Sequence, residues 1–179
     1  MVLAPLAERH LALQAVQSFG LEGRLAAAVA GEGFNANLGW TQRGERSELD
    51  LRAPLGFGAA RVVRDAGQLT LEASRGERFN GPLASDQLTQ RLGFEPPLGS
   101  LRWWVLGVSD PTGPEAIFRL SADGQTLLAL DQDGWHVDYS EYARYGQTPL
   151  TAWLPRRITL SREDVRLRLV VDRWQVPLP

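Results

Sequence analysis

Apolar residues recur at every second position over most of this 179-residue chain, and this alternation restricts the fold more than any other feature. Successive side chains of a β-strand point to opposite faces, so the pattern predicts strands with one apolar face. The segments that show it are residues 25–29, 34–40, 49–53, 69–73, 158–160 and 165–171. Turn residues lie between neighbouring segments at hairpin spacing, and the sequence therefore predicts antiparallel meanders.

Helical periodicity is limited to three segments. Apolar residues follow three- and four-residue steps over residues 3–18 and predict an amphipathic helix. A short helix is predicted at residues 83–93, with Ser85 or Asp86 as its N-cap and a glycine at its end. Another short helix is predicted at residues 100–106. These two helices interrupt the strand pattern in mid-chain.

Together these elements predict a mainly β protein, an unclosed antiparallel β-barrel of about eleven strands covered by a helical lid. A sheet of that size curls because its strands twist, and its apolar concave face needs the cover that helices can supply. We expect a single domain over residues 1–179. Its parts are an N-terminal helix (1–19), a first strand meander (20–82), a helical lid insertion (83–107) and a second strand meander (115–176).

Composition and charge exclude several classes of function. The chain has 19 basic residues, all of them Arg, against 21 acidic ones, and the net charge is −2. No basic cluster is long enough to follow a phosphate backbone, so we predict no nucleic-acid partner. The chain has no Cys, which excludes disulfides, thiolate metal sites and a thiol nucleophile. No stretch approaches the roughly 20 apolar residues of a membrane span.

Residues suited to catalysis or metal binding do not converge in the sequence. The two histidines, His10 and His136, lack companions at metal-ligand spacing, and we expect both to be structural or exposed. The carboxylates of residues 131–138 surround a predicted turn, where Asp is favoured for conformational reasons. "GFGAAR" at residues 56–61 lacks the third glycine of a dinucleotide fingerprint and opens no helix. We predict no catalytic residue, no metal and no cofactor.

Small and large apolar residues alternate along the predicted strands. Ala27, Ala36 and Ala73 stand beside Leu and Phe, which would leave space inside a curled sheet. Apolar walls with few polar groups suit a ligand that is recognised mainly by burial. The residues alone therefore predict a β-rich protein that binds an apolar ligand.

The connection after residue 53 is unusually apolar. Pro54, Leu55 and Phe57 lie in a segment without charge between Arg52 and Arg61. Turn residues are normally polar, and an apolar tip either folds onto the core or projects towards a partner or a membrane. The periodicity of the flanking strands leaves both alternatives open.

Seven short stretches, in this order, match one family. They are "FGLEGRLAAAV", "FNANLGWTQ", "LDLRAPLG", "LGSLRWWVLG", "GWHVDYSEY", "LPRRITL" and "LRLVVDRW". The chain resembles the LolB family of bacterial outer-membrane lipoprotein receptors over nearly its whole length, from about Phe19 to Trp174. Within the same fold the LolA family is an alternative, but the segment Leu101–Gly107 and the loop Pro54–Gly56 resemble LolB.

The resemblance implies a function as well as an unclosed barrel with a helical lid. A LolB-like protein would accept acylated lipoproteins from the periplasmic carrier LolA and insert them into the inner leaflet of the outer membrane, without ATP or a cofactor. It would act at the periplasmic face of that membrane, and we expect a monomer. LolB proteins carry a signal peptide and an acylated N-terminal Cys, which are not found here. This chain would then be either the mature portion with its anchor removed or an unusual member that works unanchored, and we favour the first alternative.

The resemblance also implies roles for particular residues. The loop of Leu55, Gly56 and Phe57 would insert into the membrane during release, with Leu55 foremost. The acyl chains would lie against one face of the sheet and the lid. The candidate residues of this cavity are Phe34, Leu38, Trp40, Leu49, Leu51, Leu69 and Leu71 on the sheet, with Trp104 and Leu106 on the lid side.

Two other functions are compatible with the pattern of residues. A periplasmic binding protein for free fatty acids or other apolar ligands would retain its ligand and deliver nothing to membranes. An enzyme acting on lipid or sugar would lose turnover when carboxylates or histidines are replaced, although the sequence offers no clear nucleophile.

Overall fold

Strands and three short helices make up the computed structural model, which describes residues 5–53, 58–146, 148 and 150–179. The helices are α1 (Leu6–Gln14), α2 (Pro82–Leu92) and α3 (Leu98–Trp104). The first six strands are β1 (Ser18–Val29), β2 (Glu32–Arg43), β3 (Arg46–Arg52), β4 (Ala59–Asp65), β5 (Gln68–Ala73) and β6 (Arg78–Asn80). The other five are β7 (Ile117–Leu120), β8 (Leu127–Gln132), β9 (Trp135–Arg144), β10 (Trp153–Arg162) and β11 (Val165–Gln175).

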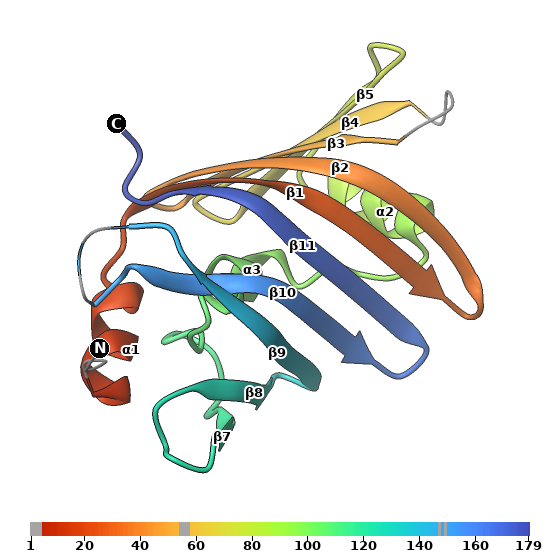
Figure 1. Ribbon diagram of the computed structural model, residues 1–179. Helices are drawn as coiled ribbons and strands as arrows, with labels where there is room; N and C mark the ends of the chain where they lie inside the picture. Colours follow the sequence, from red (N-terminus) through yellow and green to blue (C-terminus); the bar gives the residue numbers. More distant parts are fainter. Residues whose placement is uncertain (1–4, 54–57, 147, 149) are drawn as a thin grey trace.

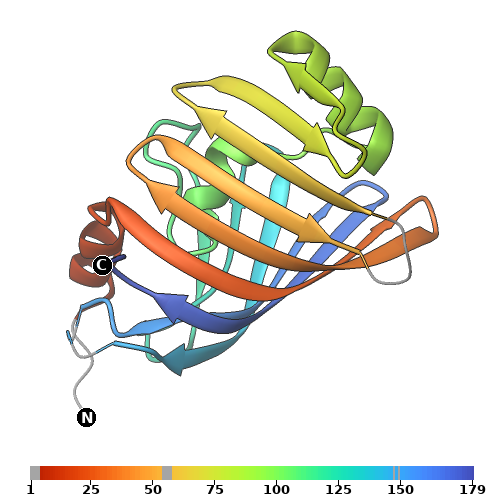
Figure 2. The same ribbon diagram turned by 90° about the horizontal axis from the view of Figure 1, so that it is seen from above.

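All the described strands belong to one antiparallel sheet, in the order β6-β5-β4-β3-β2-β1-β11-β10-β9-β8-β7. The sheet arches over α2 and α3, and α1 lies at one end of it (Figure 1). Seen from above, α2 lies beyond the β5 side of the sheet, where it packs against β5 and β6 (Figure 2). Strands β6 and β7 are the two edges, so the barrel is not closed.

The pairing of β1 with β11 joins the two meanders into one sheet. Leu25 lies opposite Leu169, and Ala27 lies opposite Leu167. A β-bulge between Glu22 and Gly23 bends this pair, and an added Cβ at Gly23 would collide with a backbone carbonyl oxygen of β11. Only glycine fits there, because bulges bring backbones closer than a side chain allows.

Residues that alternate between apolar and polar in the sequence alternate between buried and exposed in the strands. On β11 the buried residues are Val165, Leu167, Leu169, Val171 and Trp174. Arg166 and Arg168 lie between them and are exposed on the outer face. The inner, apolar face therefore lies under the arch, where the core collects, and the outer face is polar.

The lid helices lie close to their predicted positions. Helix α2 ends at Gly93, as predicted, because Gly93 adopts the left-handed conformation with φ of 83°. The prediction of Ser85 or Asp86 as its N-cap is wrong, since α2 begins after Gly81 with Pro82 in its first turn. Proline favours that position because its fixed φ suits the first helical residue and its missing N–H would have no partner.

Helix α1 is shorter than the predicted span of residues 3–18. It ends at Gln14, and β1 begins at Ser18. The carbonyl of Gln17 accepts a hydrogen bond from the backbone N–H of Gly44 at 2.7 Å, so the chain has already turned towards the sheet. Val16 continues the helical periodicity of apolar residues in the sequence, but it lies between the end of α1 and the start of β1.

The predicted fold class is confirmed, as an open antiparallel sheet with helices under its concave face. The strands predicted in the second meander are present as β7 to β11. Across the described ranges, no helix is both long and apolar enough to cross a membrane.

Candidate functional site

An apolar cavity of about 80 Å³ lies between the arch of the sheet and the lid, which comprises α2, α3 and residues 93–97 between them. The sheet residues that line it are Leu25, Phe34, Leu38, Trp40, Leu49, Leu51, Val62, Leu160, Leu167 and Leu169. The lid residues that line it are Leu88, Leu92, Phe94, Pro96, Leu98, Leu101 and Val105. Every one of these side chains is apolar, so the cavity can hold a hydrocarbon ligand but offers no group for chemistry.

Five of the predicted cavity residues line this space together. Phe34, Leu38 and Trp40 come from alternate positions of β2, and Leu49 and Leu51 lie on the adjacent strand β3. Leu38 lies opposite Leu51 and Trp40 opposite Leu49, so the period-two pattern placed all five on one face. Phe34 lies furthest towards the β1–β2 turn and is 36% exposed.

The other four predicted residues lie elsewhere in the core. Leu69 lines a neighbouring hollow of about 290 Å³ beside α2, and Leu71 is fully buried. Trp104 is fully buried and its indole N–H donates to the Gln132 side chain at 2.8 Å. Leu106 lines a cavity of about 60 Å³ beside α1. None of the four lines the apolar cavity itself.

The sequence did not identify the far wall or most of the lid lining. Leu160, Leu167 and Leu169 face the cavity from β10 and β11, which join the first meander only through the β1–β11 pair. Phe94 and Leu98 lie in or beside a segment that contains two prolines. Strand alternation did indicate that β10 and β11 have an apolar face, but not that this face meets the first meander.

A buried polar cluster fixes the end of the cavity wall near the β2–β3 turn. The indole N–H of Trp40 donates to the side-chain oxygen of Gln42 at 3.1 Å, and the Ser47 hydroxyl donates to the same oxygen at 2.6 Å. The Gln42 amide donates to the carbonyl of Gly44 at 2.8 Å. Gln42 is fully buried, so these bonds satisfy a group that would otherwise destabilise the core.

Helix α3 is held by hydrogen bonds near both ends, to the loop that follows it and to the β2–β3 turn. Near its start, the Ser100 hydroxyl donates to the Asp110 carboxylate at 2.8 Å. In its last turn, Arg102 donates to the carbonyl of Gly44 at 2.7 Å and lies over the Trp103 ring, 4.1 Å from its centroid. Burial lowers the pKa of Arg102, with Glu45 and Asp110 acting in the opposite direction.

The end of α3 is held by two buried side chains from the second meander. Gln132 uses all its hydrogen-bonding capacity: it accepts from Trp104 at 2.8 Å and from the Asp110 N–H at 2.9 Å, and it donates to the carbonyls of Asp110 and Pro114. The Tyr139 hydroxyl donates to the Trp104 carbonyl at 2.7 Å. Complete burial raises the pKa of Tyr139 well above its ordinary value.

Helix α2 is held differently. Ala84 and Leu88 are its buried residues, and both contribute apolar contacts only. Its polar contact to the sheet is an exposed ion pair of Arg91 with Glu77 at 2.9 Å. The lid therefore combines a fixed helix with one that is held mainly by apolar contacts.

The two histidines lie outside the cavity. His10 on α1 lies 3.1 Å from the Ser109 hydroxyl and packs edge-on against Phe118, and burial lowers its pKa. His136 lies on the outer face between two carboxylates, 2.6 Å from Asp131 and 3.1 Å from Asp138. Within the described parts of the chain, no group of three or more His, Cys, Asp or Glu is arranged to hold a metal ion.

The predicted membrane-inserting loop of Leu55, Gly56 and Phe57 lies outside the described residues. Its role remains a prediction from the sequence.

Comparison with known proteins decides the family. The family model described as "Outer membrane lipoprotein LolB" matches residues 17–174. This chain belongs to the LolB family. The resemblance seen in the sequence is thereby confirmed, and LolB is not a known enzyme family.

Individual LolB relatives match over most of their length. The outer-membrane lipoprotein LolB of Nitrosococcus oceani is 36% identical over 169 residues, which cover 94% of this chain and 82% of that protein. The LolB of Pseudomonas fluorescens strain Pf0-1 is 34% identical over 164 residues, covering 91% of this chain and 77% of that protein.

Solved structures share the fold at low sequence identity. A DUF1329 family protein from Desulfovibrio piger has a TM-score of 0.59 with 9% identity, covering 96% of this chain and 90% of its own. A putative outer membrane lipoprotein-sorting protein domain from Vibrio parahaemolyticus has a TM-score of 0.50 with 9% identity and the same coverage. At this level of identity, the two similarities concern the fold only.

Proposed function

We propose that this LolB-family protein is an outer-membrane lipoprotein receptor. It accepts acylated lipoproteins from a LolA-type periplasmic carrier and inserts them into the inner leaflet of the outer membrane, as a monomer and without a cofactor or catalysis. The observation that carries the proposal is the wholly apolar lining of the cavity between sheet and lid. The relatives' description as outer-membrane lipoproteins supports a lipid-anchored position at the periplasmic face of that membrane.

The cavity addresses the main energetic problem of lipoprotein transfer. Each CH₂ group moved out of water contributes roughly 0.8 kcal/mol, so one acyl chain represents on the order of 10 kcal/mol. A receptor that uses no ATP must offset most of this cost and still release the chain to the bilayer. Burial without directional contacts suits both demands, because the bilayer interior offers the same apolar surroundings.

The size of the cavity requires the lid to move. An apolar cavity of about 150 Å³ can bind a molecule as small as benzene, whereas the present cavity holds about 80 Å³ and an acyl chain is larger than benzene. An acyl chain therefore displaces part of the lining. We propose that α2 moves, since Leu88 and Leu92 contribute to the lining and the helix is held mainly by apolar contacts.

A matched pair of substitutions tests the receptor function. Phe34→Glu places a charge at the rim of the cavity on a residue that is 36% exposed, and Leu83→Glu places one on α2, outside the lining, on a residue that is 54% exposed. Labelled lipoprotein is loaded on the carrier, mixed with the receptor and liposomes, and followed by the label. We expect wild type and Leu83→Glu to accept and deliver the cargo, and Phe34→Glu to accept at least about tenfold less.

The result for wild type decides the proposal itself. A wild-type protein that takes no cargo from the carrier contradicts the receptor function. Leu55→Glu in the same assay tests the role that the family resemblance gives to this residue, and we expect normal acceptance with blocked delivery. The alternative of a binding protein for free fatty acids has no support in the comparisons, and we do not propose it.

A further inference from the structure

A second hollow, of about 550 Å³, lies on the outer face of the sheet, on the side opposite the apolar cavity. Four arginines line it: Arg119 on β7, Arg157 on β10, and Arg166 and Arg168 on β11. We call it the arginine hollow. Among the described residues, Asp138 is the only acidic one that lines it, so this lining has an excess of three positive charges in a chain whose net charge is −2.

The register of the sheet leaves Arg166 and Arg168 without carboxylates. Their cross-strand partners on β10 are Ser161 and Thr159, and their partners on β1 are two alanines. Among the residues that the structure describes, neither arginine takes part in an ion pair. Their Cα atoms lie about 7 Å apart along the strand, and two guanidinium groups from the same face of β11 thus remain available to a ligand.

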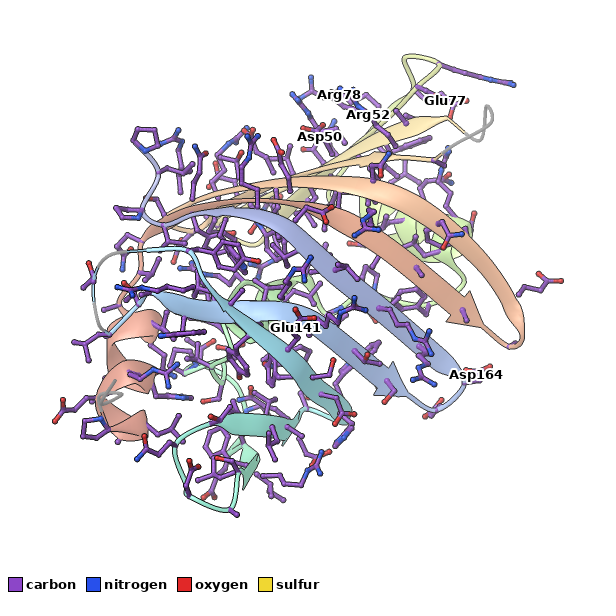
Figure 3. All side chains as sticks on the ribbon, viewed as in Figure 1. Asp50, Arg52, Glu77, Arg78, Glu141 and Asp164 are labelled. Carbon is purple, nitrogen blue, oxygen red and sulfur yellow. The ribbon has the colours of Figure 1, made fainter. Side chains whose placement is uncertain are left out.

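Elsewhere on the outer face, several arginines are paired with acids. Arg61 lies opposite Asp50 and contacts it at 2.8 Å, and Arg173 lies opposite Glu22 and contacts it at 2.6 Å. Figure 3 shows Asp50 projecting outward from its strand. Arg166 and Arg168 differ from these paired arginines, because no acid lies opposite either of them.

The chemistry of the hollow suits phosphate. Guanidinium groups bind phosphate oxygens bidentately, and their charge is retained at any physiological pH. The hydroxyls of Ser140 and Thr159 also line the hollow and can donate to the same oxygens. Arg119 already contacts Asp138 at 3.1 Å, and Arg157 contacts Glu141 at 2.7 Å, so Arg166 and Arg168 carry the free charge.

We propose that the arginine hollow binds the phosphate head groups of anionic phospholipids at a bilayer surface. The arginines come from three strands and form a two-dimensional array, which matches a field of head groups better than one extended acidic segment. The choice of a lipid as the source of the phosphate rests on the proposed function, which requires the protein to meet a bilayer.

Binding to vesicles without cargo or carrier tests this inference. The vesicles contain phosphatidylcholine alone or phosphatidylcholine mixed with phosphatidylglycerol. The test variant is Arg166→Gln with Arg168→Gln. The control is Arg24→Gln with Arg173→Gln, which removes two positive charges from the same outer face, but from arginines paired with Asp172 and Glu22.

We expect the wild type to prefer the mixed vesicles and to bind them more weakly as salt is added. The test variant should bind them at least about tenfold more weakly, and the control within about twofold of wild type. Equal losses in the two variants, or no preference of the wild type for anionic vesicles, would overturn the proposal. The proposal would also be overturned if the test variant kept vesicle binding but, in the absence of vesicles, accepted cargo more slowly from the carrier. That result would mean that the arginine hollow contacts an acidic protein.

A failure of the proposed receptor function can be distinguished from a failure of the proposed lipid binding by the arginine hollow. If no variant accepts cargo from the carrier, while the test variant alone loses vesicle binding, the receptor function fails and the arginine hollow is supported.

Discussion

The two helices of the lid cover the same cavity but are held by different forces. Helix α3 is tied to the sheet by hydrogen bonds through Arg102 and Trp104, most of them buried. Helix α2 buries Ala84 and Leu88 and has one exposed ion pair, through Arg91. Hydrogen bonds require particular partners in particular directions, whereas apolar contacts accept any apolar surface.

This difference assigns separate tasks to the two helices. An acyl chain that enters the cavity can replace the apolar contacts of α2 with its own at small net cost in free energy. It cannot replace the hydrogen bonds of α3, because it carries no donor or acceptor. We infer that α3 is a fixed wall and that α2 is the part that yields to the cargo.

The strongest test breaks the anchor of α3. Gln132→Leu removes four hydrogen bonds and leaves the indole N–H of Trp104 and the backbone N–H of Asp110 buried without an acceptor. The Asp110 carbonyl keeps the Gly113 N–H as a partner, and Pro114 is exposed to water. Each of the two unsatisfied groups costs about 1–3 kcal/mol, so we expect a loss of about 2–6 kcal/mol in the free energy of unfolding. Urea unfolding followed by tryptophan fluorescence measures it.

The control for this test lies on the other helix. Gln90→Leu replaces an exposed glutamine of α2, and we expect a change within about 0.5 kcal/mol. Similar losses in the two variants would contradict the assignment of Gln132 as the anchor of α3.

A second test weakens α2 alone. Leu88→Ala removes a buried leucine that lines the cavity, and such changes cost about 2–5 kcal/mol when the site cannot collapse. Because α2 is held mainly by apolar contacts, we expect it to detach while the sheet stays folded, so that the loss is local. Hydrogen exchange should accelerate in the amides of α2 about tenfold or more and change little in α3.

Leu83→Ala is the matched control, since Leu83 lies on the same helix and is exposed. Equal acceleration in both lid helices after Leu88→Ala would show that the lid opens as one unit. That result would contradict the division between a fixed and a yielding helix.

The sheet half of the site was predictable because strand alternation is a local property. Spacing put Phe34, Leu38 and Trp40 on one face of the sheet, and the family resemblance gave the expectation that this face lines the cavity, which it does. The end of α2 was also predictable, since a left-handed cap favours glycine at position 93. The pairing of β1 with β11 was not, because it joins residues about 150 apart and depends on how both meanders curl.

The anchors of α3 were missed for a different reason. Gln132 sits in a strand, where a polar residue is normally expected to face solvent, and the sequence does not show that its amide meets Trp104. Trp104 was expected, from the family resemblance, to line the lid side of the cavity. Its indole N–H turns it towards the buried amide instead, since a buried donor requires an acceptor.

The smallest expected effect concerns Tyr139, the second anchor of α3. Tyr139→Phe removes the hydrogen bond to the Trp104 carbonyl, which keeps the Gly107 N–H as a partner. We therefore expect a loss of only about 1 kcal/mol at neutral pH. The loss should appear in the unfolding of the whole protein, since α3 is fixed to the sheet, and exchange in α2 should not change selectively.

The effect of Tyr139→Phe on the free energy of unfolding should also depend on pH, because the hydroxyl that it removes is buried. Burial holds the pKa of Tyr139 in the folded protein well above the 10.0 of an unfolded chain. Its contribution to stability is therefore fully present below about pH 10 and is lost as the pH rises further, because only the unfolded state releases the proton. We expect the wild type to lose stability above pH 10 more steeply than Tyr139→Phe, by up to about 1.4 kcal/mol per pH unit. Tyr142, whose pKa burial also raises, keeps part of the slope in both proteins, and identical slopes would mean that Tyr139 is not held in the buried position beneath α3.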